Sequence, residues 1–142
     1  MNYLLDTCVI SELVAKRSNP RVVAWVDRIE EPRLYLSVIT IGEIRKGIEK
    51  LADSRRKTIL RAWLDDQLLV RFSERILPLD IQTLLEWGRL AARLESKGKP
   101  MSALDSLIAA SALARGLALV TRNENDFQDV GVTIINPWTL DS

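Results

Sequence analysis

The chain has 142 residues, of which 47% are hydrophobic and 27% are charged, a mixture typical of one folded domain rather than a disordered chain. Its formal net charge is only +1, so a polyanionic partner would have to be held by local basic patches or bound cations, not by the field of the whole protein. The absence of histidine excludes the Ser-His-Asp arrangement and, with a single cysteine, leaves carboxylates as the groups for any chemistry.

Strands and helices are predicted to alternate along the chain. A short apolar run at the N-terminus predicts a buried strand that ends at Asp6. Asn19 and Pro20 mark the start of one helix, and Gly116 marks the end of another. The predicted helices are 9–14, 19–30, 38–51, 53–72, 80–97 and 102–114. The predicted strands are 2–5, 34–37, 76–77, 117–121 and 133–135.

This alternation predicts an α/β fold with a mostly parallel central sheet and helices on both faces, because parallel neighbours need crossover connections. We expect residues 1–142 to form a single domain. In such sheets, ligands bind beyond the carboxyl ends of the strands.

Membrane insertion is not expected. The most apolar long stretch, 103–120, is interrupted by Asp105 and Arg115, so it predicts a buried helix and strand. The N-terminus shows no secretory leader, since Asp6 already places a charge there, and the lone Cys8 cannot form an internal disulfide. We therefore expect a soluble protein of the reducing cytoplasm.

Four separated acidic residues are the candidates for a site. Asp6 follows the first strand, Glu43 lies about two turns into the helix after the second, Asp105 begins a helix, and Asp126 follows the strand that ends at residue 121. All four can converge at one edge of the sheet, where packed carboxylates repel one another unless a cation lies between them. Oxygen ligands suit Mg²⁺ or Mn²⁺.

Each of these acids also has a structural alternative. Asp6 could cap the following helix, and Asp105 could complete a capping box begun by Ser102. Glu43 could be a solvated helix residue, and Asp126 could be a turn acid. Taken singly, the structural alternative is favoured, whereas the joint placement of the four favours a metal site.

Three neighbouring polar residues, Thr7, Thr121 and Asn123, are candidates for groups that orient a carboxylate or a water molecule, although Thr121 and Asn123 could equally form a turn. Cys8 is expected to be a packed residue rather than a nucleophile, because no histidine is available to activate it.

Aromatic and basic residues give weaker indications. The tryptophans are expected to anchor the core or an interface rather than to stack on bases. They are Trp25, Trp63, Trp87 and Trp138.

A set of basic residues could follow a phosphate backbone or simply be solvated, with 55–57 predicted as an exposed basic face. The set is Arg45, Lys46, Lys50, Arg55, Arg56, Lys57 and Arg61. Neither a phosphate-binding loop nor a dinucleotide-binding motif is present.

Four segments carry a resemblance to a known family. They are LLDTCVISEL at 4–13, IGEIRKG at 41–47, LDSLIAA at 104–110 and VTRNENDF at 120–127. In this order, and spread over essentially the whole chain, they resemble PIN-domain toxins of the VapC type, close to the FitB-like branch. Cys8 departs from the pattern, because relatives commonly have Asn after the Asp-Thr pair.

The resemblance implies a PIN-like three-layer sandwich and a metal-dependent endoribonuclease, the toxin of a toxin-antitoxin module. RNA would be hydrolysed by water activated by Mg²⁺ or Mn²⁺ held by Asp6, Glu43, Asp105 and Asp126, with Asp6 and Asp105 as the most direct ligands. A small antitoxin would cover the active site with its tail. The toxin would form homodimers and, with antitoxin, larger assemblies on operator DNA.

Two other functions compete with this hypothesis. One is a non-catalytic PIN module that serves as a binding or regulatory partner. The other is a phosphatase with Asp6 as nucleophile, which we discount because such enzymes usually have a second acid two positions later, where Cys8 stands.

Overall fold

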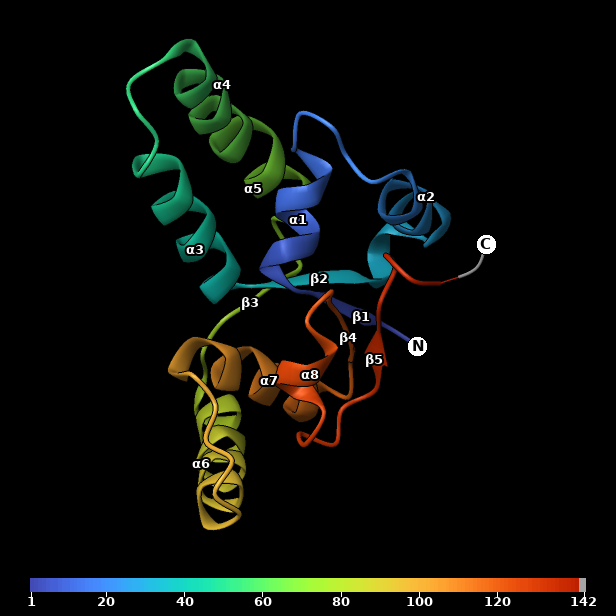
Figure 1. The fold of residues 1–142 in the computed structure, drawn as a ribbon, viewed down its shortest axis with the longest axis vertical. Coiled ribbons are helices and arrows are strands. Elements are labelled where there is room, and N and C mark those ends of the chain that lie inside the picture. The colour runs from blue at the N-terminus through green and yellow to red at the C-terminus, as the bar shows by residue number, and fades with distance from the viewer. Residues whose placement is uncertain (141–142) are drawn as a thin grey trace.

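The computed structural model describes residues 1–140, which contain a five-stranded parallel sheet with the strand order β3-β2-β1-β4-β5 (Figure 1). The strands are β1 (Tyr3–Leu5), β2 (Leu34–Ser37), β3 (Ile76–Leu77), β4 (Ala118–Val120) and β5 (Ile134–Ile135). In this order the chain runs outward from β1 to one edge of the sheet and then returns to the other side of β1 at β4. The sheet therefore has its topological switch point between β1 and β4, where ligands of such sheets bind.

Helices cover both faces of the sheet, so the predicted α/β fold is confirmed. The helices are α1 (Thr7–Leu13), α2 (Pro20–Arg28), α3 (Val38–Glu49), α4 (Arg55–Trp63), α5 (Leu69–Arg71), α6 (Ile81–Ser96), α7 (Ala103–Arg115) and α8 (Glu124–Phe127), with a 3-10 turn η1 (Glu31–Arg33) and a π turn η2 (Leu64–Leu68). Figure 1 shows α1 to α5 on one side of the sheet and α6, α7 and α8 on the other.

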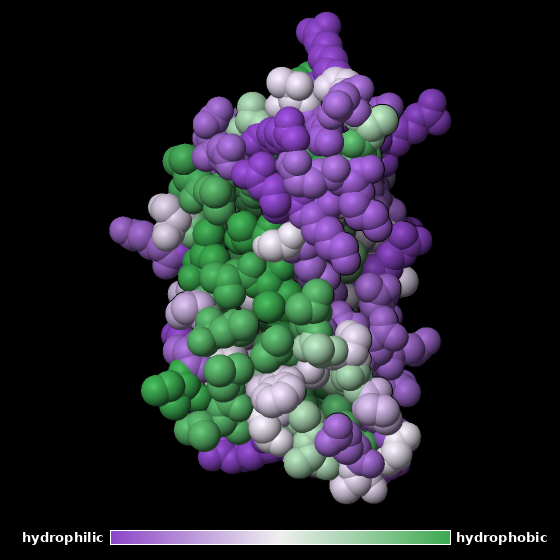
Figure 2. Space-filling view, turned by 90° about the vertical axis from the view of Figure 1, so that its left-hand side faces the viewer, coloured by the Kyte–Doolittle hydropathy of each residue, from purple (hydrophilic) through white to green (hydrophobic). Residues whose placement is uncertain are grey.

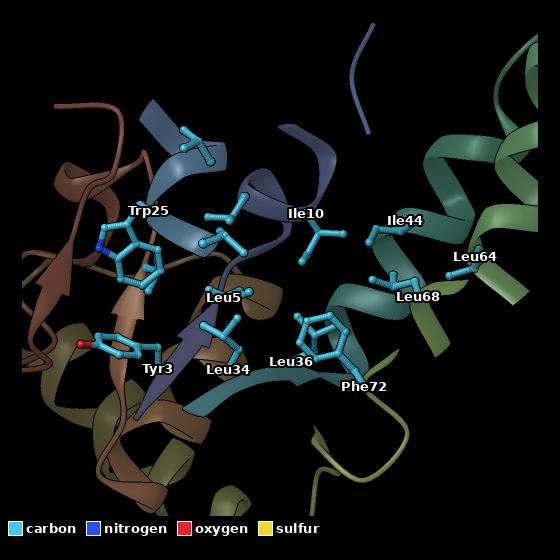
Figure 3. Packing of buried hydrophobic residues seen from close by; sticks show 14 of the residues in the cluster. Tyr3, Leu5, Ile10, Trp25, Leu34, Leu36, Ile44, Leu64, Leu68 and Phe72 are labelled. Carbon is cyan, nitrogen blue, oxygen red and sulfur yellow. The ribbon is translucent and has the colours of Figure 1, made fainter. Parts of the chain in front are cut away.

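The side chains of β1 alternate between two hydrophobic clusters. Tyr3 and Leu5 face the first cluster, together with Leu34 and Leu36 of β2, and this cluster packs against α1 to α4 and η2 (Figure 3). Leu4 faces the second cluster, which packs against α6, α7 and α8. Because both faces of the sheet are covered, the strands read as continuous apolar runs rather than as alternating sequences. The core thus fixes the register of β1, and with it the position of Asp6.

The segment predicted as one helix over 53–72 is interrupted. The α-helical hydrogen bonding of α4 gives way to the π turn η2 before α5 resumes. The apolar spacing continues through this insertion, since Leu60, Leu64 and Leu68 are all buried, so the pattern alone does not reveal it.

The predicted basic face at 55–57 is wrong in part. Lys57 is buried, and its Nζ donates to the carbonyl oxygens of Glu49 and Leu51 at 3.1 and 3.0 Å, where it satisfies groups at the end of α3. The Nη2 of Arg56 donates to the carbonyl oxygen of Val14 at 2.7 Å. Two of these cations therefore tie α4 to α1 and α3 and do not form a solvated face.

No helix within residues 1–140 is long and apolar enough to cross a membrane.

Candidate active site

Asp6 and Thr121 stand at the carboxyl ends of the two strands that flank the switch point. The backbone N–H of Asp6 donates to the carbonyl oxygen of Val120 at 2.9 Å, which extends the β1–β4 ladder by one residue. Asp6 then caps α1, because its Oδ1 accepts from the backbone N–H of Thr7 at 2.8 Å. The capping role considered as an alternative is therefore real, and it fixes the carboxylate at this edge of the sheet.

The Asp6 carboxylate is almost enclosed, with an exposed fraction of 5% for the residue. Its Oδ2 accepts from the hydroxyl of Thr121 at 2.8 Å, and the Cys8 thiol lies 3.7 Å from the same oxygen. Burial raises the pKa of Asp6 above its usual range, the hydrogen bonds from Thr121 and Thr7 oppose this effect, and nearby negative charges raise the pKa further. Those charges belong to Asp105 and Glu43, so two of the other predicted carboxylates lie within electrostatic reach of Asp6.

Glu43 reaches this edge from α3 through a threonine contact. The hydroxyl of Thr7 donates to Oε1 of Glu43 at 2.5 Å and lies 3.0 Å from the hydroxyl of Thr40. Thr40 is fully buried and stands one turn before Glu43 on the same helix, so the two threonines connect α1 to α3. Thr40 was missed from the sequence, although its spacing of three residues from Glu43 is the signal that could have identified it.

Asp105 lies in the first turn of α7. Ser102 caps this helix, and its hydroxyl accepts from the backbone N–H of Asp105 at 3.3 Å. Among residues 1–140, no hydrogen bond runs from the Ser102 backbone N–H back to the Asp105 carboxylate, so the capping box is only half formed. The carboxylate is half-buried and remains available to a ligand.

Asp126 is set apart from the other three acids. It lies in the short helix α8, which was not predicted, and its side chain is exposed. Within the described chain, no hydrogen bond or ion pair links Asp126 to Asp6, Glu43 or Asp105. Asp126 and Asp105 nevertheless line the same cavity, which has a volume of about 460 Å³. The structure thus places Glu43 and Asp105 within electrostatic reach of Asp6, while Asp126 shares only a cavity lining with Asp105.

Two of the three predicted orienting residues contact carboxylates directly, namely Thr7 and Thr121. Asn123 acts through its backbone, since its N–H donates to the Thr121 hydroxyl at 3.0 Å while its side chain is exposed. Burial and the neighbouring charge of Asp6 raise the pKa of the Cys8 thiol, which keeps it protonated at neutral pH. The Cys8 Sγ also lies 3.6 Å from the Thr121 hydroxyl, so the thiol packs between the two strand ends.

The tryptophans serve packing within the described chain. Trp25 is buried and meets Tyr3 edge to face at a centroid distance of 5.1 Å, while Trp63 and Trp138 pack against the same hydrophobic cluster. Trp87 donates from its indole Nε1 to the Ser106 hydroxyl at 2.9 Å, which joins α6 to α7.

The donor set of this site fits a hard divalent cation. Asp6, Glu43 and Asp105 offer carboxylate oxygens, and no salt bridge within residues 1–140 neutralises any of them. As they stand, the described residues do not form a closed group of three or more ligands. Mg²⁺ does not require one, because it is usually held by one or two carboxylates and keeps several waters.

Comparison with known proteins gives a match over most of the chain. The family described as PIN domain matches residues 3–132. A VapC ribonuclease, Y4jK of Sinorhizobium fredii, is 37% identical over 135 residues, which cover 95% of this chain and 96% of that protein. Toxin FitB of Neisseria gonorrhoeae is also 37% identical, over 95% of this chain and 97% of its own. A solved structure of FitAB bound to an IR36 DNA fragment superposes with a TM-score of 0.92 at 35% identity, covering 99% of this chain and 98% of that one.

Proposed function

This chain belongs to the PIN-domain family, in the branch of VapC-type toxins that includes FitB, and from that premise we propose that it is a metal-dependent endoribonuclease acting as the toxin of a toxin-antitoxin module. The observation that carries the proposal is the buried Asp6 at the switch point of the sheet, with Glu43 and Asp105 close enough to raise its pKa. Residues 1–142 act as a single catalytic domain in this proposal, and its substrate, RNA, places the enzyme in the cytoplasm.

The proposal assigns the metal to the acidic set. Asp6 and Asp105 are the most direct ligands of Mg²⁺ or Mn²⁺, and Glu43 and Asp126 complete the site or position water. When bound, the ion supplies a water molecule of lowered pKa and a positive charge beside the scissile phosphate. The Thr121 hydroxyl donates to one oxygen of Asp6, and the Thr7 hydroxyl donates to one oxygen of Glu43, so in this proposal the two threonines fix the orientation of these carboxylates.

Contacts to the RNA backbone are assigned to Lys46 on α3 and to Lys50 at the C-terminal cap of this helix, which are both exposed. Two other cations of the same region are already engaged, since Arg61 pairs with Glu49 at 2.6 Å and Arg45 pairs with Asp65 at 3.2 Å. Fewer of the predicted basic residues are therefore free to contact phosphate than the sequence indicates. A bound metal ion would supply positive charge beside the phosphate.

A groove between α1, α3 and α4 is the proposed binding place of the antitoxin tail. It has a volume of about 190 Å³, and its apolar lining includes Val14, Ile44, Leu60 and Trp63. Glu43 stands in the same lining, so a segment bound there would extend to the acidic site. The structure of FitAB bound to an IR36 DNA fragment supports a larger assembly on DNA. In this proposal the antitoxin carries that assembly to operator DNA.

A hydrophobic face supports a homodimer. Figure 2, which views the side of the molecule where α3 and α4 lie, shows a broad band of hydrophobic side chains. The exposed large hydrophobic residues between β2 and α7 are Val38, Leu51, Ile59, Val70, Ile81, Leu84 and Leu85. A band of this extent on a single chain is typical of an interface, and the proposal assigns it to a second copy.

Purified chain mixed with single-stranded RNA tests the function. We expect cleavage with added Mn²⁺ or Mg²⁺, no cleavage in EDTA, and recovery when the cation is restored in excess. RNA that stays intact under all metal conditions, with the protein folded by circular dichroism, would favour the non-catalytic binding module instead. Intact carboxylates at the four positions support the catalytic alternative.

A further inference from the structure

The cavity beside Asp105 extends well beyond the carboxylates of the proposed catalytic site. At about 460 Å³ it falls within the range of about 300–1,000 Å³ typical of small-molecule sites. It lies between the connection of α6 to α7 and the segment that begins with α8. Asp105 and Asp126 line it, so a group bound there would be next to the scissile phosphate.

One part of the cavity wall is apolar. Leu94 and Val130 are buried in the second hydrophobic cluster, and Met101 packs against that cluster while remaining half-buried. All three line the cavity. Such a wall offers van der Waals contact to a flat, weakly hydrated face, and the polarizable thioether of methionine makes favourable contacts with aromatic rings.

The remaining wall is polar and acidic. Asn125 and Gln128 bring amide groups that both donate and accept hydrogen bonds. Three carboxylates, those of Asp105, Asp126 and Asp129, face a single cation in the lining, Lys99, whose Nζ lies 3.5 Å from Asp129. Without a bound cation, as in EDTA, the net negative charge disfavours a phosphate inside the cavity. It favours a neutral ring whose amino groups can donate to carboxylate oxygens.

We infer that this cavity, called here the base cavity, binds one nucleobase of single-stranded RNA next to the scissile bond and prefers a base with an exocyclic amino group over uracil. The inference rests on the proposed ribonuclease function. Asp105 and Asp126 are committed to the metal, and Lys99 pairs with Oδ1 of Asp129. Oδ2 of Asp129 is therefore the carboxylate oxygen left to accept from the amino group, as acidic residues do from cytosine N4. Unstacked bases of single-stranded RNA are recognised in this way, by packing on one face and hydrogen bonding at one edge.

Cytosine and uracil make the sharpest pair of probes, because they have the same size and differ at one edge by an amino group in place of a carbonyl oxygen. We would measure binding of fluorescein-labelled hexamers of C and of U to the full chain by fluorescence anisotropy, in EDTA at low salt. Removing the metal prevents cleavage, and repulsion of the phosphates acts equally on both hexamers. One extra hydrogen bond predicts that the C hexamer binds about fivefold more tightly.

Three variants locate the preference. Asp129→Asn replaces one of the two carboxylate oxygens with an amino group at constant size, so the side chain can donate to uracil as well as accept from cytosine. It is expected to reduce the C-to-U ratio to about one. Met101→Ala removes apolar contact and should weaken both hexamers while keeping their ratio. The matched control is Asp66→Asn, an exposed aspartate of η2 outside the cavity, which should leave both affinities unchanged.

Equal binding of the two hexamers, or a ratio in Asp129→Asn that equals the wild-type ratio, would overturn the inference. A ratio that changes as much in Asp66→Asn would overturn it as well. The proposed function fails separately. A chain that discriminates C from U but never cuts RNA would contradict the ribonuclease function and support the base cavity. A chain that cuts RNA but binds both hexamers equally would support the ribonuclease function and contradict the base cavity.

Discussion

The hydroxyl of Thr121 donates to Oδ2 of Asp6 at 2.8 Å and joins the ends of β4 and β1 at the point where the candidate active site begins. Among the interactions of Asp6, it is the one that most stabilises the charged form against the effect of burial. We expect Thr121→Val to raise the pKa of Asp6 further and to slow RNA cleavage at neutral pH about tenfold or more, the value of one hydrogen bond to a charged group. Thr121→Ser keeps the hydroxyl and should retain most of the activity.

The measurement is the initial rate of cleavage as a function of pH. The rise in activity of Thr121→Val should move to higher pH than that of the wild type. Equal profiles for the valine and serine variants, with both folded, would show that the hydroxyl has no part in the site.

A second prediction concerns the threonine link to Glu43. Thr7→Val removes the hydrogen bond to Glu43 and the contact with Thr40 but keeps the side-chain shape. Groups that orient metal ligands typically change metal affinity by about 10- to 100-fold, so more Mn²⁺ should be needed for half-maximal cleavage. The rate at saturating Mn²⁺ should fall much less. A loss of rate that is the same at every Mn²⁺ concentration would contradict the assigned role, and Thr7→Ser is the control.

A third prediction uses the raised pKa of Asp6 as a stability effect. Because the folded-state pKa lies above the unfolded one, Asp6 contributes its full stability when protonated, and that stability is lost as pH rises through the folded pKa. Asp6→Asn does not ionise, so it avoids the loss of stability at high pH, and it keeps a side chain that can cap α1. In EDTA, urea unfolding should therefore show a more stable variant at pH 8 and no such gain at acid pH. A variant that is less stable than wild type at pH 8 would contradict this account.

A fourth prediction concerns Glu31, whose contribution to stability changes with pH in the opposite direction to that of Asp6. Its hydrogen bonds from Arg71 and Arg75 lower its pKa to about 2, so it contributes stability above about pH 4.5 that is lost as pH falls toward 2. The Glu31 side chain is 43% exposed, so solvent screening limits the effect of Glu31→Gln to about 1 kcal/mol at pH 7. Unfolding free energies at pH 7 and pH 2.5 check this, because the difference between the variants should shrink at the lower pH. A constant difference would point to packing instead.

Variants of Lys57 and Lys50 distinguish a lysine that stabilises the fold from one that contacts RNA. Lys57→Met leaves the carbonyl oxygens at the end of α3 without their donor and should lower stability by about 1–3 kcal/mol. Its affinity for RNA at a temperature where it is folded should equal that of the wild type. Lys50→Met, made on an exposed neighbour, should do the reverse: unchanged stability and weaker binding with a shallower salt dependence.

Much of the fold could be predicted because local pattern and burial agree in this chain. Leu34–Ser37 and Ile76–Leu77 were predicted with the observed bounds, since each is a short apolar run that begins directly after an arginine. The side chains of Ser37 and Asn19 cap the N-termini of their helices, so these helix starts can be predicted from the sequence. The π turn η2 was not predictable, because it inserts without breaking the apolar spacing.

The sequence predicted which acidic residues are candidates for the site, but not how their side chains are arranged relative to one another. The sequence order places Asp6, Glu43 and Asp105 at one edge of a parallel sheet, whereas the position of Asp126 depends on a four-residue helix, α8, with no distinct sequence signal. Charges also mislead when their partners are distant along the chain. Nothing near Arg56 in the sequence indicates that its guanidinium bonds to the Val14 carbonyl oxygen, 42 residues away.

The central claim is that carboxylates at the switch point of the sheet cut RNA with a divalent cation. The most direct measurement is the initial rate of cleavage of single-stranded RNA in Mn²⁺ by the wild type and by Asp6→Asn and Asp105→Asn, which keep side-chain size and remove charge. The account predicts that both variants stay folded and lose more than about a hundredfold in rate, since each removes a direct metal ligand. A folded variant of either kind that cleaves at the wild-type rate would contradict it.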